Sequence, residues 1–120
     1  MNDQTKQRIE DLLGSKRVIL FMKGSPDFPQ CGFSMRAVSI LKAMNTDFGS
    51  FDILADDEVR AGMKEYGNWP TFPQLWVSGE LVGGCDIVTE MFQSGELKTL
   101  ISEAAARAQS TQPSADSSTK

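Results

Sequence analysis

A single cysteine, Cys31, begins the four-residue run CGFS and precedes a stretch with helical periodicity. The backbone N–H groups at the start of a helix have no partners within it and favour negative charge, so a thiol placed there ionises more readily than usual. Ser34 stands where a dithiol redox motif carries its second cysteine. Cys31 can therefore bind a metal or exchange a disulfide, but it cannot close a local Cys-x-x-Cys ring. This pattern favours a protein that holds a ligand over an ordinary disulfide reductase.

The residues around Cys31 favour an accessible sulfur. Gly32 leaves the sulfur uncrowded, and Pro29 breaks regular structure before it. Lys23 ends the preceding apolar run, and its ammonium group would lower the thiol pKa further if the intervening loop folds back. The alternative is that Cys31 is a small buried apolar residue, as free cysteines often are.

Residues 69–74, WPTFPQ, form a second candidate segment, with two prolines just before a predicted strand. A proline at this point removes a donor from the edge of a sheet. A cis bond before Pro73 would turn the backbone of Thr71 and Phe72 outward, where it could pair with an extended peptide. The alternative is a plain entry from a loop into a strand.

Residues 83–86, GGCD, combine a permissive turn with the start of a predicted helix. The two glycines let a ligand approach the backbone closely. Asp86 could accept hydrogen bonds from a ligand amine, or it could act only as the N-cap of its own helix. Cys85 by itself is more often a small core residue than a site. Arg60 and Lys64 lie one helical turn apart, and the alternative to a binding role for them is a solvated helix face.

These candidates must be positioned by the elements that hydrophobic periodicity and turn signals predict. The first half of the chain is predicted to form a helix at 3–13 that Gly14 ends, a strand at 18–22, a loop at 23–30, a helix from 31 to 44 and a strand at 48–53. The second half is predicted to begin with a helix that Asp56 or Asp57 caps, followed by strands at 74–77 and 80–82 around the turn Ser78-Gly79. A helix that Gly95 ends and a last helix to 108 complete the prediction. The strand–helix–strand spacing indicates a βαβ unit with parallel strands, and the later pair of strands indicates an antiparallel hairpin. The prediction is an α/β fold whose four-stranded mixed sheet carries helices on both faces.

Length and composition limit the classes of protein to which this chain can belong. The 120 residues suffice for one domain, predicted at 1–108, followed by a polar tail at 109–120 that lacks the apolar content to order itself. A net charge of −4 without a basic block disfavours nucleic acid as a partner, and no apolar run approaches the roughly 20 residues that span a membrane. The polar N-terminus and the two cysteines favour a reducing compartment such as the cytoplasm. The absence of histidine excludes Cys-His nucleophile pairs and imidazole-based zinc sites.

Four runs in fixed order, FMKG at 21–24, CGFS at 31–34, WPTFPQ at 69–74 and GGCD at 83–86, resemble a monothiol glutaredoxin of the CGFS type. The resemblance covers about residues 5–108, and it is strongest to the single-domain bacterial form. CGFS alone would be a weak signal, whereas four runs with matching order and spacing are a strong one. The resemblance implies a thioredoxin-like fold with a groove for glutathione.

The resemblance also implies which residues contact glutathione. From the glycine end of the tripeptide to its γ-glutamyl end they are Lys23, Arg60, Thr71, Phe72, Cys85 and Asp86. The first two would hold the glycine carboxylate, the next two, displayed by a cis Pro73, would pair with the cysteinyl backbone, and the last two would contact the γ-glutamyl end. Cys31 would supply the reacting or metal-ligating sulfur.

The family further implies a [2Fe–2S] cluster, which usually takes four thiolates. One chain offers only Cys31 at an accessible site, so two chains and two glutathiones would complete the ligands of a bridged homodimer. Such a ligand set is easily dismantled, which suits delivery to apo iron–sulfur proteins. Family members also pair with BolA-like proteins, and such a partner would have to bring the histidine that this chain lacks.

Two other functions stay open beside the cluster carrier. One is a glutathione-dependent oxidoreductase, at most weakly active, in which Cys31 attacks a protein–glutathione mixed disulfide and a second glutathione resolves it. Ser34 does not exclude this route, and Cys85 could also pair with Cys31 under oxidation. The other is a structural adaptor for a partner protein.

Overall fold

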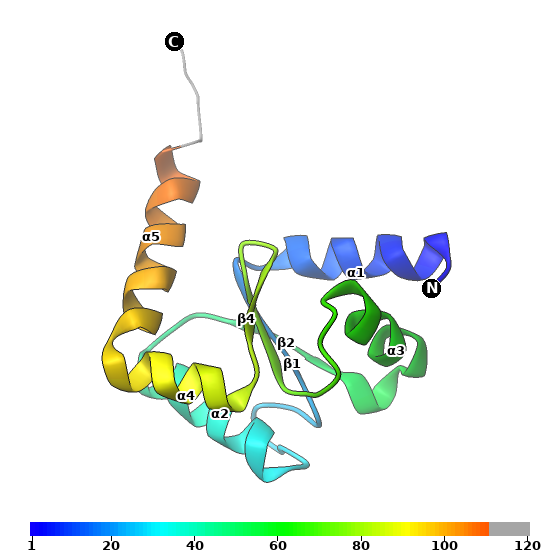
Figure 1. Cartoon of the computed structure of the whole chain (residues 1–120), viewed down its shortest axis with the longest axis horizontal. Helices are drawn as coiled ribbons and strands as arrows, with labels where there is room; N and C mark the ends of the chain where they lie inside the picture. The colour runs from blue at the N-terminus through cyan, green and yellow to red at the C-terminus, as the bar shows by residue number, and fades with distance from the viewer. Residues whose placement is uncertain (111–120) are drawn as a thin grey trace.

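A four-stranded sheet lies between two groups of helices (Figure 1). The computed structural model describes residues 1–110. The strands are β1 (Val18–Met22), β2 (Gly49–Asp52), β3 (Gln74–Val77) and β4 (Glu80–Gly83), in the spatial order β2-β1-β3-β4. β1 pairs with β2 in parallel, and β3 pairs with both β1 and β4 in antiparallel fashion. The predicted mixed sheet and its hairpin are confirmed.

All five residues of β1 are buried, because helices cover both faces of this central strand. Val18, Leu20 and Met22 point into one core cluster, while Ile19 and Phe21 point into the other. Burying a side chain of this size contributes roughly 1.5–3 kcal/mol to the stability of the fold. A strand that is buried on both faces therefore consists of a continuous run of apolar residues, and this run predicted β1.

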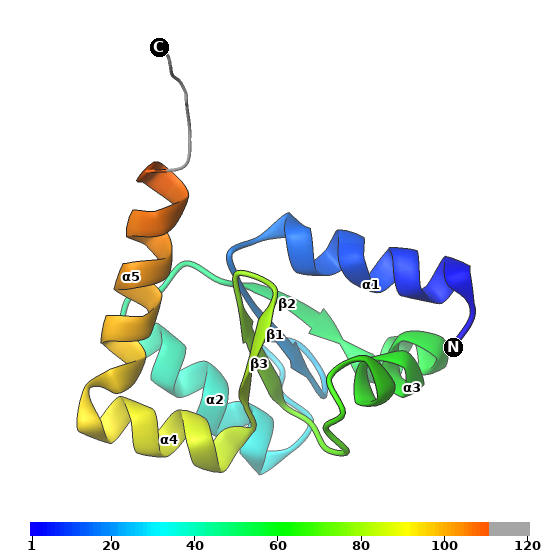
Figure 2. The same ribbon diagram turned by 45° about the horizontal axis from the view of Figure 1, so that its top comes forward.

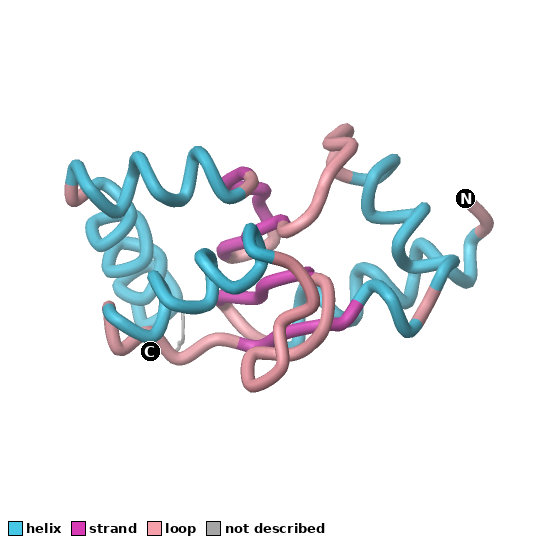
Figure 3. The backbone as a smooth tube through the Cα atoms, turned by 90° about the horizontal axis from the view of Figure 1, so that it is seen from below, coloured by secondary structure: helices cyan, strands magenta, loops and turns pink. Residues whose placement is uncertain are grey.

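The helices divide between the two faces of the sheet, as two views of the ribbon show (Figure 1, Figure 2). α1 (Asp3–Ser15) and α3 (Asp57–Tyr66) pack together on one face. α2 (Gly32–Ala43), α4 (Cys85–Ser94) and α5 (Glu96–Ser110) lie on the other. Seen from below, the strands again run between these two groups of helices (Figure 3).

Two predicted boundaries differ from the structure. Gly14 does not end the first helix, which continues to Ser15, because the chain leaves the helix at Lys16 in an extended conformation that leads into β1. The second strand is shorter than predicted, since Asp52 accepts a hydrogen bond from the N–H of Leu54 and starts a 3₁₀ turn (Ile53–Ala55). Asp56 as the N-cap of α3 and Gly95 as the C-cap of α4 are confirmed, whereas Asp86 is not the N-cap of its helix.

The C-terminal boundary of the domain stays a prediction. The backbone of α5 continues to Ser110, two residues beyond the predicted end of the domain. Most of the predicted polar tail at 109–120 lies outside the described residues. Among residues 1–110, none of the helices combines the length and the apolar character that crossing a membrane would require.

Candidate functional site

Cys31 is the N-cap of α2, where its extended backbone ends the loop that follows β1. Its Sγ accepts a hydrogen bond from the N–H of Ser34 at 3.3 Å. The side chain is partly exposed and forms no disulfide. The sulfur therefore takes the place of the oxygen that usually caps a helix, and it satisfies one of the unpaired donors of the first turn.

The loop before Cys31 folds back on itself, as the sequence interpretation required. Gly24 pairs with Pro29 in an isolated antiparallel bridge, and the N–H of Gln30 donates to the carbonyl of Lys23 at 2.8 Å. Gly24 has a φ of +90°, and a Cβ there would lie 2.5 Å from the carbonyl oxygen of Phe28. Glycine is thus required for the fold-back that brings the end of β1 close to the thiol.

Ser34 links the thiol to the end of β1. Its side chain is fully buried, and its Oγ accepts a hydrogen bond from the N–H of Lys23 at 3.1 Å. The thiol of Cys31 donates to the same Oγ at 3.4 Å. Once Cys31 loses its proton, its sulfur can only accept, and the Ser34 hydroxyl can then donate to the thiolate. Ser34, which stands in place of a second cysteine, can therefore donate a hydrogen bond to the Cys31 thiolate.

Opposing influences act on the pKa of Cys31. Partial burial raises the pKa, while the Ser34 hydroxyl, the N–H groups of Ser34 and Phe33, and the charge of Lys23 lower it. The lowering influences prevail, so the pKa of the Cys31 thiol lies below its ordinary value. A larger fraction of this thiol is consequently ionised near neutral pH, which favours both nucleophilic attack and metal ligation.

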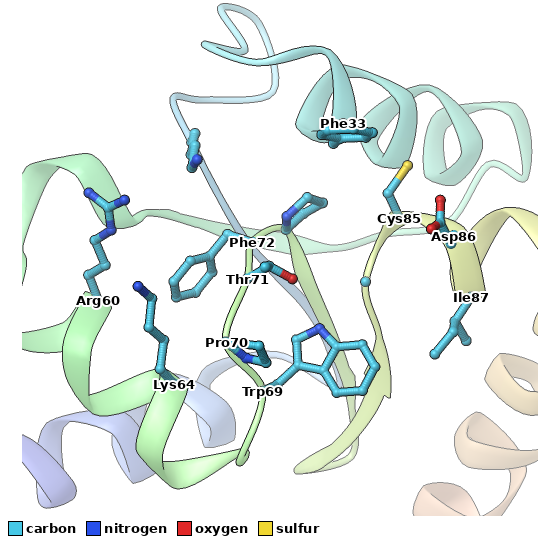
Figure 4. A pocket seen from close by; sticks show the side chains of 13 residues that line it. Phe33, Arg60, Lys64, Trp69, Pro70, Thr71, Phe72, Cys85, Asp86 and Ile87 are labelled. Atoms are coloured by element: carbon cyan, nitrogen blue, oxygen red, sulfur yellow. The ribbon is translucent and has the colours of Figure 1, made fainter.

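A groove of about 370 Å³ lies beside this thiol (Figure 4). This volume falls within the roughly 300–1,000 Å³ typical of small-molecule sites. The structure brings together in its walls all six residues that the resemblance assigned to glutathione: Lys23, Arg60, Thr71, Phe72, Cys85 and Asp86. Cys31 itself is not among the lining residues, but Phe33, two residues after it, and Lys23, whose charge acts on its thiol, both line the groove.

The two ends of the groove differ in charge. Arg60 and Lys64 extend from α3 on one side, and Asp86 lies at the opposite side (Figure 4). Lys23 is a further cation that lines the groove. The sequence suggested a place for Arg60 only through the resemblance, and it left Lys64 on a solvated helix face. The one-turn spacing of these two cations was the available signal, and the structure directs both to the groove.

Asp86 is not the N-cap of α4, so that interpretation of the sequence is wrong. Gly84 is the N-cap, and no side chain accepts from the first turn of the helix. Asp86 lies within the first turn and is exposed, which leaves its carboxylate available to a ligand. Cys85 is buried, and its carbonyl accepts from the Thr89 hydroxyl at 2.8 Å.

The loop between α3 and β3 forms the wall between the two charged ends. Its Phe72–Pro73 bond is cis, in agreement with the resemblance. The carbonyl of Thr71 accepts from the side chain of Gln74 at 3.3 Å, whereas the N–H and C=O of Phe72 have no hydrogen-bond partner among residues 1–110. The N–H and C=O of Phe72 are therefore available to pair with an extended peptide.

Trp69 is a lining residue that the sequence analysis did not assign to the site. Its indole lies against Gly84, where a Cβ would come within 3.3 Å of Nε1. This Nε1 is buried and has no hydrogen-bond partner among the described residues. The tryptophan thus closes the floor of the groove next to the start of α4 (Figure 4).

The contact between Ser34 and the thiol predicts how the reactivity of Cys31 depends on pH. In a Cys85→Ser background, the rate of alkylation by iodoacetamide should rise with a midpoint below the usual value of about 8.5 for a cysteine. Ser34→Ala removes the donor to the thiolate, so its midpoint should move to higher pH. Ser39→Ala, on the exposed face of α2, is the control and should leave the midpoint in place. An unchanged midpoint in Ser34→Ala would contradict the role given to this hydroxyl.

The chain is similar in sequence and in structure to known proteins. Residues 18–82 match the glutaredoxin family. The chain is 52% identical over 112 residues to Glutaredoxin 4 of Escherichia coli (strain K12), covering 93% of this chain and 97% of that protein. The solution structure of reduced poplar apo GrxS14 superposes with a TM-score of 0.76 at 50% identity, covering 84% of this chain and 93% of that one.

A plant relative shares the same domain within a longer protein. The chain is 57% identical over 98 residues, or 82% of its length, to monothiol glutaredoxin-S17 of Arabidopsis thaliana. It spans only 20% of that relative and 21% of monothiol glutaredoxin-S11 of Oryza sativa subsp. japonica. The thioredoxin-like architecture, the CGFS run at the start of α2 and these similarities agree, and the chain therefore belongs to the glutaredoxin family and is of its monothiol type.

Proposed function

We propose that this protein binds glutathione in the groove and, together with a second copy of itself, carries a [2Fe–2S] cluster for delivery to apo iron–sulfur proteins. The observation that carries the proposal is a partly exposed thiol of lowered pKa whose neighbours Lys23 and Phe33 line a groove with charges that complement glutathione. We place this activity in the cytoplasm, in keeping with two cysteines that are both free thiols.

The charges of the groove match the tripeptide from end to end. Glutathione carries a carboxylate at its glycine end, and the cations Arg60 and Lys64 lie at one side of the groove, which Lys23 also lines (Figure 4). Its γ-glutamyl end carries both an ammonium and a carboxylate, which suit Asp86 and the uncapped N–H groups of α4 respectively. Between them, the free backbone groups of Phe72 suit the cysteinyl residue. This order directs the glutathione sulfur towards Cys31.

The metal-ligating side chains of the protein support a cluster that two chains share. The sequence holds two cysteines and no histidine, and the described residues contain no group of three or more Cys, His, Asp or Glu side chains that could hold a metal. Cys85 is buried, so one chain contributes one thiolate, that of Cys31. Two chains and two glutathione thiolates would supply the four that a [2Fe–2S] cluster takes. The cluster is cargo here, and two soluble ligands make it easy to release.

The surface around the thiol supports contact with another protein molecule. Phe28, Phe33 and Met35 are 74%, 64% and 53% exposed, and all three lie within four residues of Cys31. Large apolar side chains gathered at one point of a surface mark interaction sites. In the proposed homodimer these residues meet their counterparts around the cluster. A BolA-like partner or an apo-protein would use the same face in place of the second copy.

A second candidate function is glutathione-dependent disulfide reduction, which the lowered pKa of Cys31 favours. The Cys31 thiolate would attack the glutathione sulfur of a protein–glutathione mixed disulfide and release the protein as a thiolate. A second glutathione thiolate would then attack the glutathione sulfur on Cys31, regenerating the Cys31 thiolate and leaving as oxidised glutathione. The route needs no second cysteine in the chain.

Cluster assembly tests the carrier directly. Under anaerobic conditions, iron, sulfide and glutathione should give a brown protein that elutes as a dimer, because both chains and both glutathiones ligate the cluster. Cys31→Ser should stay colourless and monomeric. Cys85→Ser is the matched control, since its thiol is buried and outside the ligand set, and it should still form the coloured dimer. Equal colour without glutathione, or colour in Cys31→Ser, would contradict the model.

Charge pairing at the glycine end can be tested with a modified ligand. Arg60→Gln should weaken binding of S-methylglutathione by about three- to tenfold, because a charge-assisted contact to the glycine carboxylate is lost. The glycine ester of the same ligand has no such charge, and the variant should bind it within about twofold of the unmodified protein. Lys98→Gln makes the same change in net charge outside the groove. Isothermal titration calorimetry measures the affinities of all three proteins for both ligands, and equal losses for acid and ester in Arg60→Gln would contradict the assignment.

A further inference from the structure

Gln74, the first residue of β3, is a fully buried polar side chain directly behind the groove wall. Its side chain has no exposed surface, and within residues 1–108 the only other buried polar residues are Thr5 and Ser34. A buried amide is retained at little cost only if its donors and acceptor are paired. The partners of this amide therefore indicate what it does.

The two donors of the Gln74 amide go to the groove loop. Nε2 donates to the carbonyl of Trp69 at 3.1 Å and to the carbonyl of Thr71 at 3.3 Å. Oε1 accepts from Nε1 of Trp76, the next residue but one on β3, at 3.1 Å. The side chain thus ties two carbonyls of the loop to the rigid centre of the sheet.

The loop has few other ties. Residues 69–73 all line the groove, and two of them are prolines that cannot donate a backbone hydrogen bond. Apart from the bonds to Gln74, these five residues make one backbone hydrogen bond among residues 1–110, from the N–H of Trp69 to the carbonyl of Lys64 at 3.0 Å. The Gln74 amide is consequently the main hydrogen-bonded support for the part of the wall that faces a ligand.

We propose that Gln74 is a positioning residue for glutathione. By holding the carbonyl of Thr71 inward, its amide fixes the Thr71–Phe72 peptide group, whose N–H points the opposite way, so that the free N–H and C=O of Phe72 face the groove. This inference rests on the proposed function, because it explains the fixed conformation of the loop by the recognition of the cysteinyl backbone of glutathione. The competing explanation is that Gln74 serves only to satisfy the buried indole of Trp76.

Two substitutions separate these explanations, because each removes a different end of the network. Gln74→Glu keeps an acceptor for Trp76 in either protonation state. Its carboxylate has no donor for the two loop carbonyls, whereas the protonated acid regains one. Burial raises the pKa of a carboxyl group, so both forms are reached in an accessible pH range. Trp76→Phe does the converse, since it removes the indole donor and leaves both amide donors on the loop.

The experiment measures the affinity for S-methylglutathione and the melting temperature of each variant against the unmodified protein. At about pH 5, Gln74→Glu should bind within about threefold of the unmodified protein, and at about pH 8 it should bind at least about tenfold more weakly. Trp76→Phe should lower the melting temperature but weaken binding by less than about twofold at either pH. Gln74→Met, similar in volume and without donors, replaces Gln74→Glu if the latter is unfolded at the higher pH.

Three outcomes would overturn the proposal or its foundation. A folded Gln74→Glu or Gln74→Met that binds as well as the unmodified protein at about pH 8 would overturn the positioning role. A loss of affinity in Trp76→Phe as large as that in Gln74→Met would favour a purely structural role for the amide. If the unmodified protein itself does not bind S-methylglutathione, the proposed function fails, and the failure is distinguishable because it appears before any variant is compared.

Discussion

The structure of the site depends on one interaction, the cap that the sulfur of Cys31 makes on the first turn of α2. The N–H of Ser34 donates to this sulfur, and the hydroxyl of Ser34 joins it to the N–H of Lys23 at the end of β1. The capping position fixes the thiol at a helix terminus that favours its ionised form. The hydrogen bond from the N–H of Lys23 to the Ser34 hydroxyl connects this cap to the end of the fully buried β1. The core of the fold therefore helps to hold the donors that lower the pKa of the thiol.

The remaining parts of the site are arranged around this sulfur by both faces of the sheet. α3 brings its cations from one face, and α4 brings an uncapped N-terminus and Asp86 from the other. The loop that enters β3 closes the wall between them and presents the backbone of Phe72. Charge, backbone donors and the thiol thus come from separate elements, and a linear ligand with charged ends and a central thiol matches their order. The proposed carrier function uses this match, because residues 1–110 contain no group of side chains that could hold a metal without ligands from another molecule.

The sequence analysis succeeded where a local signal decides the structure. The apolar run of β1, the Ser78-Gly79 turn and the stop at Gly95 need no knowledge of distant residues, and all three are confirmed. Asp86 was placed at the cap because aspartate favours that position, but the glycines before it let the helix begin earlier and leave its carboxylate to the groove. The roles of Trp69 and Gln74 depend on which groups fold against them, and no spacing in the chain encodes that.

The composition of the cluster-bearing complex tests the central claim most directly. Native mass spectrometry of anaerobically reconstituted protein reports the number of chains, glutathiones and clusters in one intact particle. The account predicts two chains, two glutathiones and one [2Fe–2S] cluster, because Cys31 gives one thiolate per chain. A particle that holds the cluster with a single chain, or with no glutathione, would contradict it.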